Sequence, residues 1–211
     1  MDTMRLKQLE NQWRVWMHPD EYKQLRACAE SRRAHIAIRL GGECGLRVNE
    51  TASFKLNQVR ETSVDIVDDA YFLQVWGKDT LSKHEDGKFR EAFIPLSLYR
   101  EIEKHADEEG IGPDEEIIPV TKRTTQEYIK RAAIRCADRY GNEHFNKVSS
   151  HDLRAYWASN LLLRRKVDEN VVMALGGWVS RETMEPYLNA MFDDIILNEM
   201  VDAGLARPAK A

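Results

Sequence analysis

Apolar residues along the chain change their spacing twice, which divides it into a helical part, a strand-rich part and a longer helical part. Residues 1–17 form an expected short lead-in, in which Trp and Met side chains stand among charges. His18-Pro19-Asp20-Glu21 indicates a helix start, because proline is favoured in the first helical turn and acidic residues follow it. The helices expected in this part are residues 19–31, a helix through residues 36–40 that ends at Gly41, Gly42 and Gly45, and residues 48–56.

The middle of the chain is rich in β-branched and aromatic residues, which favour strands. Three short strands are expected, at Ser63–Val67, Tyr71–Trp76 and Arg90–Pro95. Asp68-Asp69-Ala70 is the expected turn between the first two, since aspartate is common in turns. The polar residues 78–88 form a longer connection to the third strand.

Helical spacing returns at Ser97 and continues almost to the C-terminus. A polar loop at residues 142–148 separates two of the expected helices. The sequence contains no internal repeat and no low-complexity linker, so we expect one mainly helical α+β domain over residues 18–205, followed by a frayed tail at residues 206–211. The helices expected in this part are residues 98–109, 124–140, 150–165, 168–175 and 182–203.

Composition indicates a soluble protein of a reducing compartment. Charged residues make up 31% of the sequence, and the mean hydropathy is -0.56. No apolar run approaches the roughly 18 residues that a membrane span needs, and the N-terminal residues lack the apolar core of a secretory signal. Cys28, Cys44 and Cys136 match neither a disulfide framework nor a zinc site, because they are odd in number and widely spaced. We therefore expect a cytoplasmic protein without a metal.

The net charge of -4 is unusual for a DNA-binding protein, because Lys and Arg neutralise phosphates and supply much of the affinity for DNA. The distribution of charge matters more than its sum. Basic residues gather at 122–139 and 164–166, whereas acidic residues gather at 101–116 and 182–202. One basic face can therefore exist on an acidic protein, although a solvated charged surface explains either cluster equally well. The DNA contacts expected in the first cluster are Lys122, Arg123, Lys130 and Arg131.

Ser150-His151-Asp152-Leu153-Arg154 is the segment with the clearest chemical pattern. The serines before His151 can cap a helix, which places His151 and Arg154 in its first turns, where a helix N-terminus favours phosphate. Tyr187 supplies a phenol further along the chain. Cations that hold a phosphate and a phenol that attacks it are suited to phosphodiester chemistry. A cap-region histidine and a surface arginine explain this segment, taken alone, equally well.

Three further positions extend the set. Arg47, in the sequence G-L-R-V-N-E, follows a glycine-rich helix end, and Glu50 can orient it by a charge-assisted hydrogen bond; an ordinary exposed Arg–Glu helix pair is the alternative. Lys78 follows an expected strand, on a polar connection that carries two more lysines. Trp178 follows two helix-ending glycines and is either a core aromatic or an N–H donor to phosphate. The residues of the preceding helix that we expect to face the core are Val171, Val172 and Leu175.

Together these motifs resemble the catalytic domain of the tyrosine site-specific recombinases, the phage-integrase family. That family has an Arg in a G-L-R-x-x-E motif, a Lys on a β-hairpin, an H-x-L-R motif, a His or Trp after L-G, and a Tyr. The resemblance covers residues 18–203 and implies a mainly helical domain with a small three-stranded antiparallel sheet, the DNA breaking-rejoining enzyme fold. The matching residues, in the same order, are Arg47, Lys78, His151, Arg154, Trp178 and Tyr187.

The resemblance implies a recombinase or integrase that cleaves and rejoins DNA through a covalent 3′-phosphotyrosyl intermediate. Tyr187 would be the nucleophile, His151 the general base and Lys78 the general acid. Arg47, Arg154 and Trp178 would bind the phosphate, with Glu50 in a supporting role. The reaction would need no cofactor, metal or ATP, which agrees with the lack of a phosphate-binding glycine loop and of clustered carboxylates in the sequence.

The partner implied is double-stranded DNA, with no membrane and no small-molecule ligand. The apolar last helix would join protomers into a homotetramer on DNA, although packing on its own domain is an equal alternative. Most relatives carry a further helical domain before the catalytic one, so the chain resembles either a minimal integrase of an archaeal virus or mobile element or a catalytic-domain fragment. Two other functions fit the fold: strand passage like that of type IB topoisomerases, and DNA binding without catalysis. Retention of the polar site residues argues against the second.

Overall fold

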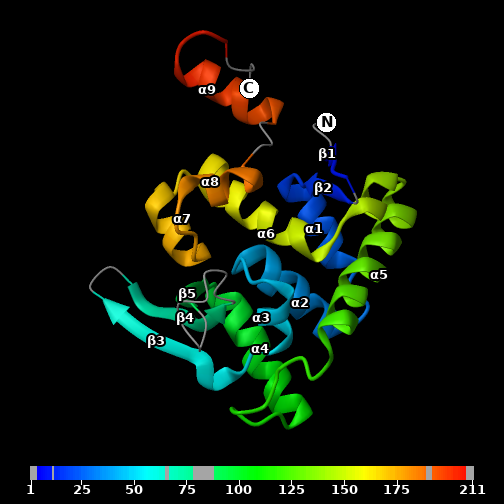
Figure 1. The fold of residues 1–211 in the computed structure, drawn as a ribbon, viewed down its shortest axis with the longest axis vertical. Coiled ribbons are helices and arrows are strands. Elements are labelled where there is room, and N and C mark those ends of the chain that lie inside the picture. The colour runs from blue at the N-terminus through cyan, green and yellow to red at the C-terminus, as the bar shows by residue number, and fades with distance from the viewer. Residues whose placement is uncertain (1–3, 11, 65–66, 78–87, 189–191, 208–211) are drawn as a thin grey trace.

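The computed structural model describes residues 4–10, 12–64, 67–77, 88–188 and 192–207 (Figure 1). The lead-in is a β-hairpin, which its sequence pattern did not predict. Strands β1 (Arg5–Gln8) and β2 (Trp13–Trp16) pair antiparallel, with Leu6 opposite Val15. The hairpin packs on the body through Met4, Val15 and Met17, all of which are buried.

Helix α1 (Pro19–Ala27) begins where the sequence indicated but ends earlier than expected. His18 caps it, and the Glu21 carboxylate accepts the backbone N–H of both His18, at 2.7 Å, and Met4, at 2.8 Å. Ser31, the expected end of this helix, instead caps the next one, because its hydroxyl accepts the Ala34 N–H at 3.2 Å. The following helices are α2 (Arg32–Glu43) and α3 (Val48–Ala52).

The three-stranded antiparallel sheet has the order β3-β4-β5. Its strands are β3 (Val59–Val64), β4 (Val67–Gly77) and β5 (Lys88–Ile94). The expected turn at residues 68–70 is wrong: Ala70 is buried and pairs with Thr62, so β4 already includes these residues. Pairing with β3 supplies their backbone with hydrogen-bond partners and outweighs the local turn preference of aspartate.

The second helical part follows the expected order with one break. Pro186 lies where a continuous helix over residues 182–203 was expected, and proline lacks the N–H that an interior helical position needs. The chain there forms a short α8 (Arg181–Met184), a 3-10 turn (Glu185–Tyr187) and a separate α9 (Asp193–Asp202). The polar loop at 142–148 contains another 3-10 turn (Glu143–Lys147). The remaining helices are α4 (Leu96–Glu109), α5 (Lys122–Tyr140), α6 (Ser150–Ser159), which continues as a π-helical turn (Asn160–Arg164), and α7 (Glu169–Gly176).

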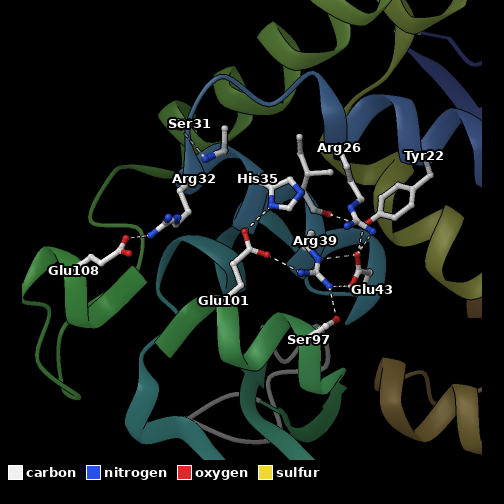
Figure 2. A network of polar contacts seen from close by, with 12 residues as sticks. Tyr22, Arg26, Ser31, Arg32, His35, Arg39, Glu43, Ser97, Glu101 and Glu108 are labelled. Carbon is white, nitrogen blue, oxygen red and sulfur yellow. Dashed lines mark hydrogen bonds and ion pairs between the residues drawn. The ribbon is translucent and has the colours of Figure 1, made fainter. Parts of the chain in front are cut away.

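Helix α2 is buried on two sides and separates the two largest core clusters. Ile38 packs with the hairpin, α1, α5 and α6, whereas Ile36 and Leu40 pack with α4 and the inner face of the sheet. A polar network also fixes α2 to its neighbours (Figure 2). In it the buried Arg39 donates to Glu43 and, at 2.6 Å, to Glu101 of α4. The C-terminal part of α2 also lies against the start of α6, where a Cβ at Gly41 would come within 2.9 Å of the Leu153 side chain.

Candidate active site

The start of α6 is tied to the N-terminal hairpin by Asp152. One carboxylate oxygen accepts the backbone N–H and the hydroxyl of Ser149, at 2.8 and 2.7 Å. The other accepts the Val15 N–H of β2 at 2.9 Å. His151 lies in the first turn of α6, as the sequence predicted, and it is exposed. Asp152, the second residue of the H-x-L-R motif, therefore links α6 to the hairpin, which sequence reasoning missed.

Arg154 is buried, with an exposed fraction of 2%, so the alternative of a surface arginine is wrong. Its guanidinium donates to the Gly45 carbonyl and, at 2.5 Å, to the Gly176 carbonyl. These carbonyls lie at the C-terminal ends of α2 and α7, where the helix dipole is negative and favours a cation. Gly45 has a φ of +66°, and a Cβ there would lie 2.5 Å from the Trp157 ring, so this approach requires glycine.

Arg47 caps α3 at the rim of the site, and 42% of its side chain is exposed. Glu50 accepts from the Arg47 backbone N–H at 2.7 Å and from its guanidinium at 2.9 Å. The expected orienting contact is therefore present. Glu50 itself is buried, so this is not an ordinary exposed helix pair.

Arg90 is a site residue that sequence reasoning missed. It lies on β5 with an exposed fraction of 5%, and it donates to Glu50 at 2.6 Å and to the Leu175 carbonyl at 2.8 Å. Residues 90, 92 and 94 share the buried face of the strand, because side chains alternate along it. In the sequence, an arginine two positions before Ala92 and four before Ile94 was the signal that could have predicted a buried, paired cation on this face.

Trp178 and Tyr187 pack against each other, with tilted rings, next to Arg154. The ring centroids of the two aromatic residues are 5.2 Å apart, and the Arg154 guanidinium carbon lies 4.4 Å from the Trp178 centroid and 6.0 Å from that of Tyr187. Trp178 is buried and also stacks on Trp157, so it is a core aromatic as well as a site residue. The expectation that Val171 faces the core is wrong, because α7 buries Val172 and turns Val171 to solvent.

Lys78 lies outside the described residues. Of the four expected DNA contacts, Arg123 and Lys130 line a groove of about 410 Å³ beside the start of α6, together with Lys147, Ser149 and Ser150. Lys122 is close enough to act on the charge of His151. Arg131 instead forms an ion pair with Glu30 at 3.3 Å.

The site has an excess of positive charge although the protein is acidic. Loss of water around the imidazole lowers the pKa of His151, and the charges of Arg14 and Arg154 lower it further. Burial, followed by the charges of Arg47 and Arg90, lowers the pKa of the Arg154 guanidinium. Such a site favours the neutral form of His151 and attracts an anion.

The described residues contain no group of three His, Cys, Asp or Glu side chains arranged to hold a metal ion. No helix among them has the length and apolar character needed to cross a membrane.

The model described as the Phage integrase family matches residues 15–193. No curated protein matches. The chain is similar to the crystal structure of XerA recombinase, with 20% identity and a TM-score of 0.66 over 93% of this chain and 66% of that chain.

Structures bound to DNA substrates show the same fold. XerH site-specific recombinase bound to palindromic difH substrate, in a post-cleavage complex, is 18% identical, with a TM-score of 0.62 over 90% of this chain and 53% of that chain. A lambda integrase (75-356) dimer bound to a COC' core site is 18% identical, with a TM-score of 0.52 over 81% of this chain and 57% of that chain. The chain thus spans between about half and two thirds of each solved chain. The expected mainly helical fold with its small antiparallel sheet is confirmed.

Proposed function

Because the chain belongs to the phage integrase family, we propose that it is a site-specific DNA recombinase or integrase that cleaves and rejoins strands through a covalent 3′-phosphotyrosyl intermediate. The observation that carries this proposal is the grouping of Tyr187, Trp178 and Arg154. A phenol packed beside a buried cation is the arrangement that attack on a phosphate requires. A protein that only binds DNA has no need of it.

In the proposed cleavage step, the phenolic oxygen of Tyr187 attacks the phosphorus of a DNA phosphodiester. A bond forms between these atoms, and the bond from phosphorus to the 5′ oxygen breaks. An ordinary phenol keeps its proton at neutral pH, so a base is needed, and His151 accepts this proton. Lys78 gives a proton to the departing 5′ oxygen. Attack by the 5′-hydroxyl of another strand reverses these steps and rejoins the DNA. One ester replaces another, so the reaction consumes no ATP.

Arg154 and Arg47 would contact the phosphate in different ways, because one is buried and the other is exposed. Arg154 is held by two backbone carbonyls and is therefore fixed before DNA arrives, which is the condition for strong stabilisation of developing charge. Arg47 is exposed and anchored at one side by Glu50, so its remaining donors face outward to the substrate. The Trp178 indole N–H is a further donor to the phosphate.

We propose double-stranded DNA as the substrate, bound across the groove lined by Arg123, Lys130 and Lys147. Positive charge at this groove leads directly to the start of α6. We also propose that α9 links protomers into a tetramer on DNA. Phe192 and Ile195 pack on the chain's own core, whereas Ile196, Leu197 and Met200 remain exposed and available to a second copy. Light scattering with and without DNA measures this state.

A pool of nicked duplexes, randomised in sequence beside the nick, tests the chemistry. Cleavage next to the nick releases a short 5′-hydroxyl fragment that diffuses away and traps the covalent adduct. The expected result is an SDS-stable adduct with the wild-type chain and none with Tyr187→Phe. Failure of the wild type to form an adduct, or an adduct with Tyr187→Phe, would overturn the assignment. Relaxation of a supercoiled plasmid without exchange between paired sites would instead favour the topoisomerase-like function.

A further inference from the structure

Strand β2 of the N-terminal hairpin contacts the turn that carries Tyr187 through two side chains. The Trp16 indole N–H donates to the Tyr187 carbonyl at 3.2 Å, and the Arg14 guanidinium carbon lies 5.3 Å from the Tyr187 ring centroid. Alternate residues of a strand point to opposite faces, and Val15 accordingly packs in the core. The hairpin therefore presents Arg14 to the candidate active site. Its neighbours Trp13 and Val15 pack on the core and hold the hairpin in place.

Arg14 differs from the other arginines of the site in its hydrogen bonding. Arg47 and Arg90 donate to Glu50, and Arg154 donates to two carbonyls. The Nη1 atom of Arg14 is buried without an acceptor among the described residues. The Nε atoms of Arg90 and Arg154 are also buried and unpartnered there, but their Nη atoms have acceptors. A buried N–H of a charged group without an acceptor costs free energy, so the Nη1 atom of Arg14 is suited to binding a ligand.

The charges around Arg14 identify the chemical class of that ligand. Asp152 lies near enough for its charge to interact with Arg14, but its oxygens already accept from Val15 and Ser149. His151 is near enough to Arg14 for their charges to interact. Its other charged neighbours include Arg154 and Arg47. A guanidinium whose Nη1 atom has no acceptor in the described part of the chain, with other cations nearby, suits an anion with several oxygens. The anion that the proposed function brings to Tyr187 is a DNA phosphate.

We propose that Arg14 binds a phosphate of the DNA substrate beside Tyr187, so that the N-terminal hairpin supplies part of the active site. This inference rests on the proposed function and adds a substrate-binding residue to it. Arg14 precedes residues 15–193, which the family model matches, so family membership assigns it no role. Trp16 is a positioning residue in this arrangement, because it holds the main chain of Tyr187 and touches no reacting atom.

The salt dependence of DNA binding measures this contact. The protein carries Tyr187→Phe, which keeps the ring but cannot form an ester, and the probe is a fluorescent duplex of random sequence titrated at about 50 to 200 mM NaCl. Each phosphate that a protein neutralises contributes about 0.9 to the slope of log K against log salt. Arg14→Met should therefore reduce the slope by about 0.9, whereas Arg14→Lys should retain it.

Arg33→Met is the matched control, because it also replaces one arginine by methionine but lies away from the site. Arg33 is at the N-terminal end of α2, where it pairs with Glu109 at 2.7 Å. Its slope should equal that of the parent. An unchanged slope for Arg14→Met, or an equal reduction for both variants, overturns the proposal. Modification of the parent protein by phenylglyoxal needs no substitution: duplex DNA should protect Arg14, read by mass spectrometry, and failure to protect it also overturns the proposal.

These measurements do not depend on cleavage, so they separate this inference from the proposed function. Suppose that the wild-type chain forms an adduct and that Arg14→Met has the same salt slope as the parent. This result supports the recombinase function and shows that Arg14 does not bind phosphate. A reduced slope without any adduct supports the phosphate contact and rejects the covalent chemistry.

Discussion

Arg90 donates a hydrogen bond of 2.6 Å to Glu50, and the buried pair joins β5 to α3. Burial by itself raises the pKa of Glu50, but the charge of Arg90 and the contacts with Arg47 outweigh it and lower that pKa. Glu50 is therefore ionised at neutral pH. One carboxylate thus compensates a buried arginine and anchors the exposed arginine of the site.

Glu50→Ala should reduce the free energy of unfolding by about 3–5 kcal/mol, because it leaves the Arg90 charge buried and unpaired. Urea unfolding measures this. Glu127→Ala, which breaks the exposed pair between Arg123 and Glu127, should cost less than about 1 kcal/mol. Similar losses in the two variants would contradict a special role of the buried pair.

Arg47→Ala and Arg154→Ala should both abolish adduct formation, but only the second should weaken the fold. Arg47 is exposed at the rim, so its loss should change stability by less than about 1 kcal/mol. Removal of the buried Arg154 leaves the carbonyls of Gly45 and Gly176 unpartnered and opens a cavity, at a cost of about 3 kcal/mol. Thermal unfolding beside the adduct assay distinguishes the two, and wild-type cleavage by either variant would contradict the assigned roles.

Cleavage should depend on pH through His151. Loss of water around the imidazole and the charges of Arg14 and Arg154 lower the pKa of His151, so the neutral base persists below the usual value of about 6.5. The single-turnover rate should rise with pH only in the acidic range and reach its plateau before pH 7. Arg14→Met removes a repelling cation and should shift this rise to higher pH.

His151→Gln provides the control for that pH profile. It should remove the acidic limb and slow cleavage by about 10²- to 10⁴-fold without eliminating it. A wild-type rate that does not change with pH from 5 to 7, or a His151→Gln profile that keeps the limb, would show that another group accepts the proton.

Glu101 should supply acid-sensitive stability to the network of Figure 2. Burial by itself raises the pKa of Glu101, but hydrogen bonds from His35 and Arg39 lower it to about 2. A carboxyl group with a lowered pKa stabilises the fold above its unfolded pKa, about 4.3, and loses this contribution as the pH falls toward 2.

Glu101→Gln should therefore be less stable than the wild type at pH 7, by at most about 3 kcal/mol, and the difference should shrink below pH 4. Urea unfolding at pH 7, 4 and 2.5 measures it. Glu116→Gln, at an exposed position, should follow the wild type throughout. A difference between Glu101→Gln and the wild type that stays constant with pH would contradict the assignment.

Local patterns predicted most elements because caps, turns and side-chain alternation depend on neighbouring residues. The start at His18-Pro19 is confirmed, and so is the order of helices and strands from α1 to α7. The errors arose where a local preference met a longer-range contact. Ala70 pairs across the sheet despite the turn-forming aspartates before it, and Tyr187 lies in a 3-10 turn because Pro186 interrupts the expected helix.

The order of short motifs along the chain determined the family, the fold class and the candidate residues, because each motif is a local arrangement of a few side chains. Only the tertiary structure decided which charges are buried and what they contact. Glu50 and Arg90 are 40 positions apart, Gly45 and Arg154 are 109 apart, and Trp16 and Tyr187 are 171 apart. Such pairs form only when packing removes water from both partners, and that depends on the path of the whole chain rather than on the spacing within any segment.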